Sequence, residues 1–302
     1  MILNRLPAPA LAAAGIAFAL WLVFAPFSAH PTNDDFLYAR SAEILAREGR
    51  YVAVAHNGQA PAAALFPVAL AALAIKVCGY SFRLLHLLQA LVAAAGAFAA
   101  WKLVRDLRQP RAIGVAAALA LVASPWMFGQ VFTFMTDAPA AALLVVAISC
   151  FCAALFRDSP GAWIAGGVAA GLAVATRQTS LVVILFPIAA LVIARRLGAP
   201  ARLSPWMVLA IALPVLAALL PDWFGFGPPQ AERAAFVRRR DFSAPQLKAM
   251  ALALYGAALV VGVGSAPLLP LLIYRPFPFV LRTRVGKAIV LAGLLPFLAL
   301  AA

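Results

Sequence analysis

Long apolar runs separated by short charged clusters make up most of this chain. Residues 81–104 and 138–156, for example, are predominantly apolar and are followed by charged residues. A helix of about 20 apolar residues spans the hydrocarbon core of a bilayer. Comparable runs occur at residues 6–27, 113–128, 163–175, 181–194, 206–220, 247–273 and 287–302. The pattern therefore predicts an all-α polytopic membrane protein, with residues 1–302 forming one transmembrane domain of about nine spans.

The stretch from residue 31 to residue 59 breaks this pattern soon after the first apolar run. It places two adjacent carboxylates, Asp34 and Asp35, directly before residues 36–48, whose apolar and charged positions follow a helical period. An amphipathic helix of this kind lies on a membrane surface rather than crossing it. We therefore expect residues 28–80 to form an outer loop with juxtamembrane helices, and residues 221–245 to form a second outer loop.

Composition agrees with a membrane protein, because 65% of the residues are hydrophobic, 11% are charged and the mean hydropathy is +0.98. These values exclude an ordinary soluble globule. The net charge of +14 is attributed to basic cytosolic loops and to contact with anionic lipid, so no nucleic-acid partner is predicted. The three cysteines lie within apolar runs without metal-type spacing. Residues 6–27 are expected to be a retained first helix rather than a cleaved signal peptide.

The positions of the basic residues decide the predicted orientation. If residues 61–79 cross the membrane, the clusters around Arg105 and Arg195 fall outside, against the positive-inside rule. If residues 61–79 instead stay at the outer face as a re-entrant or interfacial helix, both clusters become cytosolic. This second arrangement, which we prefer, brings the acidic pair, Asp137 and Arg177 together on the outer side.

Polar residues at three positions are candidates for chemistry at that face: Asp34 with Asp35, Asp137, and Arg177 with Gln178. Ionisable residues in a membrane are unfavourable unless paired, and are therefore functional candidates. A guanidinium binds phosphate through two hydrogen bonds and a carboxylate accepts a proton, which suits a reaction on a phosphate-bearing lipid. Each position also has a structural interpretation: solvated loop acids, a helix cap at Asp137, or an interfacial side chain at Arg177.

Two histidines and a further arginine complete the candidates. His56, near the end of the acidic loop, is a candidate for substrate or metal binding, although a lone loop histidine is usually neither. His86 lies in an apolar run beside Arg83 and Gln89, and is expected to provide polar packing between helices. Arg83 is expected to assist Arg177 at a phosphate. The sequence requires no cofactor; if a divalent cation is used, the acidic pair would hold it.

Four short motifs occur in a characteristic order: NDDFLY at 33–38, CGYSFRLL at 78–85, FMTDAP at 134–139 and TRQT at 176–179. Together they resemble the GT-C fold glycosyltransferases, in the bacterial branch near the protein mannosyltransferases and the lipid A aminoarabinose transferases. The resemblance extends over about residues 8–197. It implies that the first-loop acid, Asp34 or Asp35, is catalytic. It also implies that Asp137 is a second outer-loop acid and that Arg177 is the basic residue near the outer end of the fifth span.

The resemblance further implies an inverting transfer of a sugar from a polyprenyl-phosphate donor to a lipid, glycan or protein. The protein would lie in the cytoplasmic (inner) membrane with its active site facing the periplasm or exterior. Asp34 or Asp35 would be the general base. The substrate contacts would be Tyr38, His56, Arg83, Asp137, Arg177 and Gln178.

The chain also departs from the family pattern. Many relatives are longer and carry an outer soluble domain that helps to bind the acceptor. The usual His-Pro-Pro pattern of the first loop is replaced here by Gln59-Ala60-Pro61. Two other interpretations therefore stay open, a shortened non-catalytic membrane scaffold and a lipid or sugar transporter. A transporter would be indicated by inverted repeats, and a scaffold by ionisable side chains that do not gather in space.

Overall fold

A computed structural model describes residues 35–54, 64–107, 109–123, 133–157, 159–196 and 203–223, together with the single residues 127, 284 and 287. Every regular element within these ranges is a helix. The predicted all-α membrane fold is therefore confirmed. The apolar runs predicted at residues 6–27, 247–273 and 287–302 lie outside the described residues, as does the loop predicted at 221–245 beyond residue 223.

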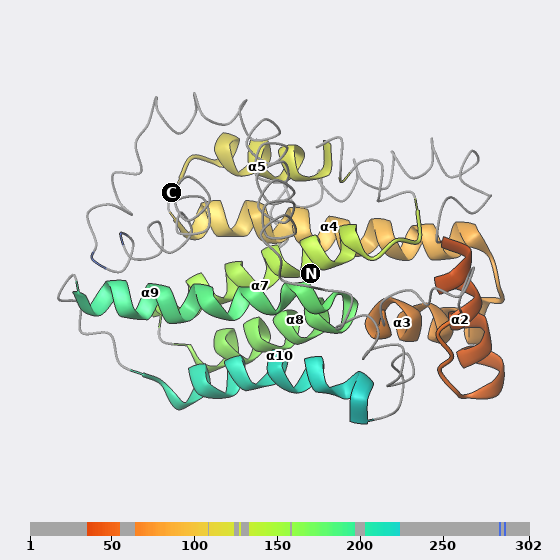
Figure 1. Ribbon diagram of the computed structural model, residues 1–302. Coiled ribbons are helices and arrows are strands. Elements are labelled where there is room, and N and C mark those ends of the chain that lie inside the picture. Colours follow the sequence, from red (N-terminus) through yellow and green to blue (C-terminus); the bar gives the residue numbers. More distant parts are fainter. Residues whose placement is uncertain are drawn as a thin grey trace, which may run out of the picture.

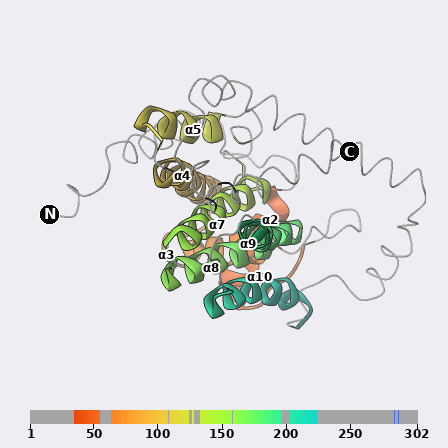
Figure 2. The same cartoon turned by 90° about the vertical axis from the view of Figure 1, so that its left-hand side faces the viewer.

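The helical bundle is built in sequential layers (Figures 1 and 2). Its elements are α4 (Phe82–Asp106), α5 (Arg111–Ala123), α7 (Asp137–Arg157), α8 (Pro160–Thr176), η2 (Gln178–Ile184), α9 (Leu185–Arg196) and α10 (Pro205–Trp223). Contacts join α5 to α4, α4 to α7, α7 to α8, and α8 to α10 in that order. Helix α9 packs beside α7, where Ala190 contacts the cluster around Cys152.

Three helical segments are long and apolar enough to cross a membrane: Phe82–Asp106, Asp137–Arg157 and Gln178–Arg196. The last combines η2 and α9, so the span predicted at 181–194 begins as a 3-10 helix rather than an α-helix. The other apolar helical stretches are shorter, at 10–17 residues: Leu65–Cys78, Arg111–Val122, Pro160–Thr176 and the Pro205–Leu219 part of α10. Helix α5 covers the predicted run 113–128 as far as Ala123, and residues 124–126 and 128 lie outside the described residues.

Small residues allow the bundle layers to approach closely. A Cβ added at Gly167 of α8 would lie only 2.6 Å from the Cα of Ala210 in α10. A Cβ at Gly96 of α4 would lie 2.7 Å from the Cβ of Ala142 in α7. Membrane helices commonly pack through such small residues, because burial of apolar surface provides little driving force in lipid. The glycines therefore determine how tightly α4, α7, α8 and α10 pack.

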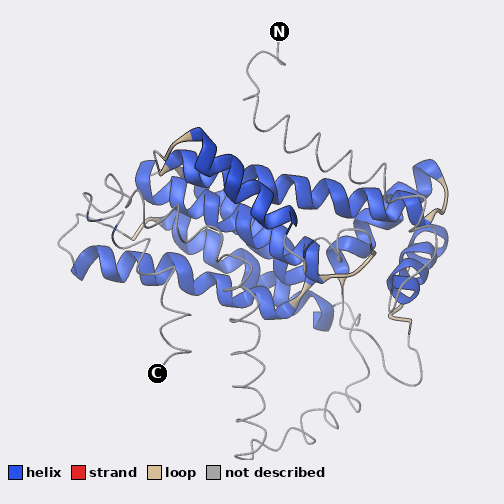
Figure 3. Ribbon diagram, turned by 90° about the horizontal axis from the view of Figure 1, so that it is seen from above, coloured by secondary structure: helices blue, strands red, loops and turns tan. Residues whose placement is uncertain are grey.

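Helices α2 (Asp35–Glu48) and α3 (Leu65–Cys78) pack against each other at one end of the bundle (Figures 1 and 3). In Figure 1, α2 runs across the end of α4 rather than along it. Helix α3 has 14 residues, or about 21 Å, which is less than the roughly 30 Å of a hydrocarbon core. It ends at Gly79, whose φ of 82° lies in the left-handed region that favours glycine.

A single hydrophobic cluster attaches these two helices to the bundle. It contains Tyr38 and Ala42 of α2, Val68 of α3, Leu85 of α4, and Phe134 from the segment before α7. Because one cluster includes side chains from all four segments, the start of α2 has a defined position relative to α4 and α7.

Candidate active site at one end of the bundle

The bundle has two chemically different ends. Helices α4 and α7 begin at the end covered by α2 and α3, and α8 finishes there; we call this the α2 end (Figure 1). The opposite end, where α4 and α7 finish, is the basic end. It carries Lys102, Arg105, Arg111, Arg157, Arg195 and Arg196. Every predicted site residue that the structure describes lies at or near the α2 end.

Asp35 is the first residue of α2, and its side chain is fully buried. The Oδ2 atom of Asp35 lies 3.7 Å from Nε2 of His86, whose side chain is also 0% exposed. A carboxylate is unfavourable in an apolar interior unless a charged or hydrogen-bonding group faces it. The structure therefore places the acid of α2 opposite the imidazole of α4, one turn inside the bundle.

The same face of α4 also contacts the segment that leads into α7. Gln89, three residues after His86, donates a hydrogen bond from Nε2 to the carbonyl oxygen of Met135 at 3.1 Å. Thr136 follows and is buried, and α7 then begins at Asp137. Helix α4 thus contacts Asp35 of α2 through His86, and it contacts the segment before α7 through Gln89.

Asp137 and Arg177 form a direct ion pair between the start of α7 and the end of α8. The Asp137 side chain is 23% exposed and the Arg177 side chain is 43% exposed, so the pair lies at the edge of the bundle. Asp137 also occupies the first turn of α7, so the interpretation as a helix-start residue and the ion pair hold together. Arg177 is the C-cap residue of α8, with φ −146° and ψ 119°, and its side chain binds a carboxylate.

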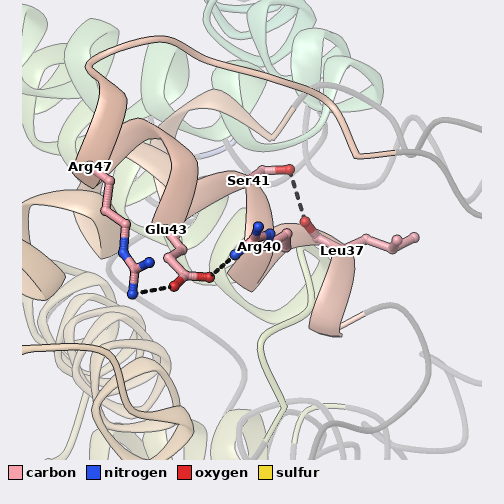
Figure 4. Close-up of polar contacts among 5 residues, drawn as sticks. All are labelled: Leu37, Arg40, Ser41, Glu43 and Arg47. Carbon is pink, nitrogen blue, oxygen red and sulfur yellow. Dashed lines mark hydrogen bonds and ion pairs between the residues drawn. The ribbon is translucent and has the colours of Figure 1, made fainter.

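The solvent-facing side of α2 carries its own ion pairs (Figure 4). Glu43 forms ion pairs with Arg40 at 2.6 Å and with Arg47 at 2.7 Å, and both arginines are exposed. On the other side of the helix, the Ser41 hydroxyl donates to the Leu37 carbonyl and accepts the N–H of Val54. The amphipathic helix predicted at 36–48 is therefore present, with buried and charged sides as its sequence indicates.

Two tyrosines near α2 have perturbed ionisation. Burial raises the pKa of Tyr51; a backbone hydrogen bond with Ala64 lowers it, and the nearby Tyr38 raises it. Burial also raises the pKa of Tyr80. The negative charge of Glu43 raises this pKa further, and the positive charge of Arg40 lowers it. Both phenols are therefore more strongly held in their neutral form than free tyrosine.

The other predicted contacts differ in exposure. Tyr38 is buried in the cluster that joins α2 to α3, whereas Arg83 and Gln178 are exposed at the first turns of α4 and η2. Substrate binding by these three residues stays a prediction. Asp34 and His56 lie outside the described residues.

A small groove opens beside Gln89. Its wall is apolar except for the side chain of Gln89, and it is lined by Phe66, Pro67, Leu70, Leu88, Gln89, Val92, Phe134 and Pro139. Among the residues that the structure describes, no three His, Cys, Asp or Glu side chains are grouped closely enough to hold a metal ion. A cation at the acidic pair stays a prediction.

Comparison with protein families identifies the kind of protein. The sequence model of the dolichyl-phosphate-mannose-protein mannosyltransferase family matches residues 62–223, just over half of the chain. The chain belongs to this family. It is therefore a membrane glycosyltransferase of the GT-C kind, as its motifs led us to expect. No curated protein and no solved structure matches the chain.

The transferase brings together one pair that the motifs indicated and one that they did not. The Asp137–Arg177 pair joins two residues that were both candidates. The contact of Asp35 with His86 was missed, since His86 was assigned to helix packing. One signal was present: His86 and Gln89 are three residues apart and share a helix face in an otherwise apolar run.

Proposed function

We propose that this glycosyltransferase transfers a sugar from a polyprenyl-phosphate donor to a hydroxyl or amine of a lipid, glycan or protein. Transfer takes place with inversion, at the outer face of the cytoplasmic membrane. The observation that carries the proposal is the gathering of Asp35, His86, Asp137 and Arg177 at one end of the bundle. A non-catalytic scaffold has no need for such an arrangement.

The acidic pair supplies the general base of the proposed reaction. Asp34 or Asp35 takes the proton from the acceptor, whose oxygen or nitrogen attacks the anomeric carbon of the donor. A new bond forms on one face of the sugar while the bond to the phosphate oxygen breaks on the other. Polyprenyl phosphate leaves with the bonding electrons, and the anomeric configuration inverts. Positioned acid–base groups of this kind typically contribute about 10²- to 10⁴-fold in rate.

Arg177 is assigned to the phosphate of the donor. Its guanidinium is held beside Asp137 and remains partly exposed, so it is accessible to a group approaching from the membrane surface. A charge-assisted hydrogen bond to phosphate contributes about 1.5–3 kcal/mol, and its strength grows as negative charge develops on the leaving group. Asp137 orients this guanidinium, while Gln178 and Arg83 extend the polar surface around it.

The two ends of the bundle support the proposed orientation. The basic end carries six lysines and arginines on its described helix termini, and Asp106 pairs with two of them, Lys102 and Arg157. Placing this end in the cytosol puts the clusters around Arg105 and Arg195 inside, as the positive-inside rule favours, and the α2 end outside. The short helix α3, packed on α2, supports the interfacial position that the charge pattern of residues 61–79 predicted.

The proposal is tested with the full-length protein in lipid nanodiscs and a set of radiolabelled polyprenyl-phosphate sugars. Release of polyprenyl phosphate is measured with and without an extract of bacterial envelope lipids, glycans and proteins as acceptor. Asp34→Asn and Asp35→Asn are compared with the unaltered protein. We expect turnover by the unaltered protein, loss in at least one variant, and retained donor binding in both. Full turnover in both variants contradicts the mechanism.

A further inference from the structure

The contact between Asp35 and His86 has features of a positioning device. Both side chains are fully buried, and they belong to elements that are distant in the sequence. Neither imidazole nitrogen of His86 has a hydrogen-bond partner among the described residues, and Nε2 lies 3.7 Å from Oδ2 of Asp35. A buried imidazole without hydrogen bonds is unfavourable, which points to a role beyond packing.

The surroundings of His86 hold it in a defined place. Phe82 lies one turn earlier on α4, with its ring centroid 6.1 Å from that of His86. Gln89, one turn later, is fixed to the Met135 carbonyl. The imidazole therefore belongs to a rigid helix face, whereas the carboxylate opposite it belongs to the first residue of α2.

We propose that His86 is a positioning residue, which orients the acidic pair through Asp35. The proposal rests on the proposed function, in which that pair supplies the base. Across the 3.7 Å between Nε2 and Oδ2, the imidazole stabilises the position of the Asp35 carboxylate and, with it, the first turn of α2. Asp35 is fully buried, and this favours the adjacent Asp34 as the acid that meets the acceptor.

Kinetics test this division of roles in the same nanodisc assay. Loss of precise orientation reduces turnover by about 100-fold without direct loss of a reacting group. We therefore expect His86→Ala to lower kcat by about this factor while KM for the donor stays unchanged. His86→Gln, whose amide N–H can replace the imidazole N–H, should recover part of the loss. Asp34→Asn should be more severely impaired than either His86 variant.

Two further variants separate positioning from general damage to the bundle. In the double variant His86→Ala with Asp35→Asn, kcat should equal that of Asp35→Asn alone, because both changes remove one interaction. Ser149→Ala is the matched control. Its hydroxyl is likewise buried without a hydrogen-bond partner among the described residues, but it lies on α7. This control should retain full turnover.

A spectroscopic measurement tests the contact without relying on turnover. The chain has three histidines, so ¹⁵N-imidazole spectra are simple, and His86→Gln assigns the relevant signal. Asp35→Asn should shift the His86 nitrogens, whereas Asp106→Asn at the basic end should leave them unchanged. An unchanged His86 signal in Asp35→Asn overturns the proposal, even if a variant fails to fold well enough for kinetics.

The outcomes distinguish this inference from the proposed function. If Asp34→Asn is inactive and His86→Ala is fully active, the function stands and the inference is wrong. If Asp35→Asn is inactive while Asp34→Asn is fully active, Asp35 is itself the base and the positioning role is wrong. If the His86 signal depends on Asp35 but neither acid is needed for turnover, the contact is real and the proposed mechanism fails.

Discussion

The two ends of the bundle each contain acids facing basic groups, but they use them differently. At the basic end, Asp106 pairs with Lys102 at 2.5 Å and with Arg157 at 2.7 Å; the Lys102 side chain is 39% exposed and that of Arg157 is 62% exposed. At the α2 end, Asp35 faces a buried imidazole, and Asp137 binds a single partly exposed arginine. Exposed pairs of the first kind contribute little to stability and join helix ends. The full burial of Asp35 opposite His86, rather than the mere presence of ion pairs, distinguishes the candidate active site.

The strongest test of this comparison replaces one arginine at each end with alanine. Arg177→Ala should lower turnover by about 10²- to 10³-fold, the usual effect of removing one donor that stabilises developing charge. Arg157→Ala removes an arginine that also pairs with an aspartate, yet we expect its turnover to remain within about threefold of the unaltered protein. The release of polyprenyl phosphate measures turnover in both variants. Equal losses in the two variants would show that the ends do not differ in function.

The packing between the ends gives the next largest effect. Gly167→Ala places a Cβ 2.6 Å from the backbone of Ala210, and such overpacking typically destabilises by about 1–3 kcal/mol. Gly171→Ala is the control on the same helix, since its added Cβ would lie 3.6 Å from the nearest atom, in ordinary contact. We expect a lower thermal midpoint for Gly167→Ala alone. Similar midpoints in both variants would argue against close packing of α8 on α10.

A smaller effect is expected from removing the acid of the basic end. Asp106→Asn removes the ion pairs of Asp106 with Lys102 on the same helix and with Arg157 of α7. Together these pairs contribute about 1 kcal/mol or less, because both cations are in contact with solvent. The loss of stability should diminish as salt is added, since salt screens exposed charges. Turnover should be unchanged. A large loss of turnover would assign this network a role in catalysis that its exposure does not suggest.

The smallest effect concerns pH at the α2 end. The pKa of Tyr51 is raised by burial, so the folded state keeps its proton at a pH where the unfolded chain loses it. Tyr51 therefore contributes stability below about pH 10, and this contribution is lost as pH rises through the folded pKa. Thermal midpoints between pH 8 and 11 should fall more steeply for the unaltered protein than for Tyr51→Phe. Parallel curves would show that Tyr51 ionises normally.

Local patterns in the sequence predicted the elements better than their contacts. Apolar periodicity placed α4, α7, α8 and α10 within a few residues, because membrane helices are defined by their own composition. It did not reveal the 3-10 geometry of η2, which depends on neighbouring segments.

The candidate site follows the same division. Asp137 and Arg177 were recognisable from motifs at the ends of apolar runs, and the structure pairs them. The approach of His86 to Asp35 depends on how α2 crosses the end of α4, which no local pattern in either segment specifies. A polar residue within an apolar run indicates that a partner exists, but its identity comes from the tertiary fold.

The 3-10 segment after Arg177 has a mechanical consequence. Seven residues at about 2.0 Å rise extend roughly 14 Å, compared with about 10.5 Å in an α-helix. With the twelve residues of α9, the segment reaches about 32 Å, close to the thickness of a hydrocarbon core. Arg177 therefore lies at one end of this segment and Arg195 with Arg196 at the other, separated by about the thickness of the hydrocarbon core. In a thinner bilayer, η2 would shorten by rewinding toward α-helix, and the depth of Arg177 in the membrane would change with bilayer thickness.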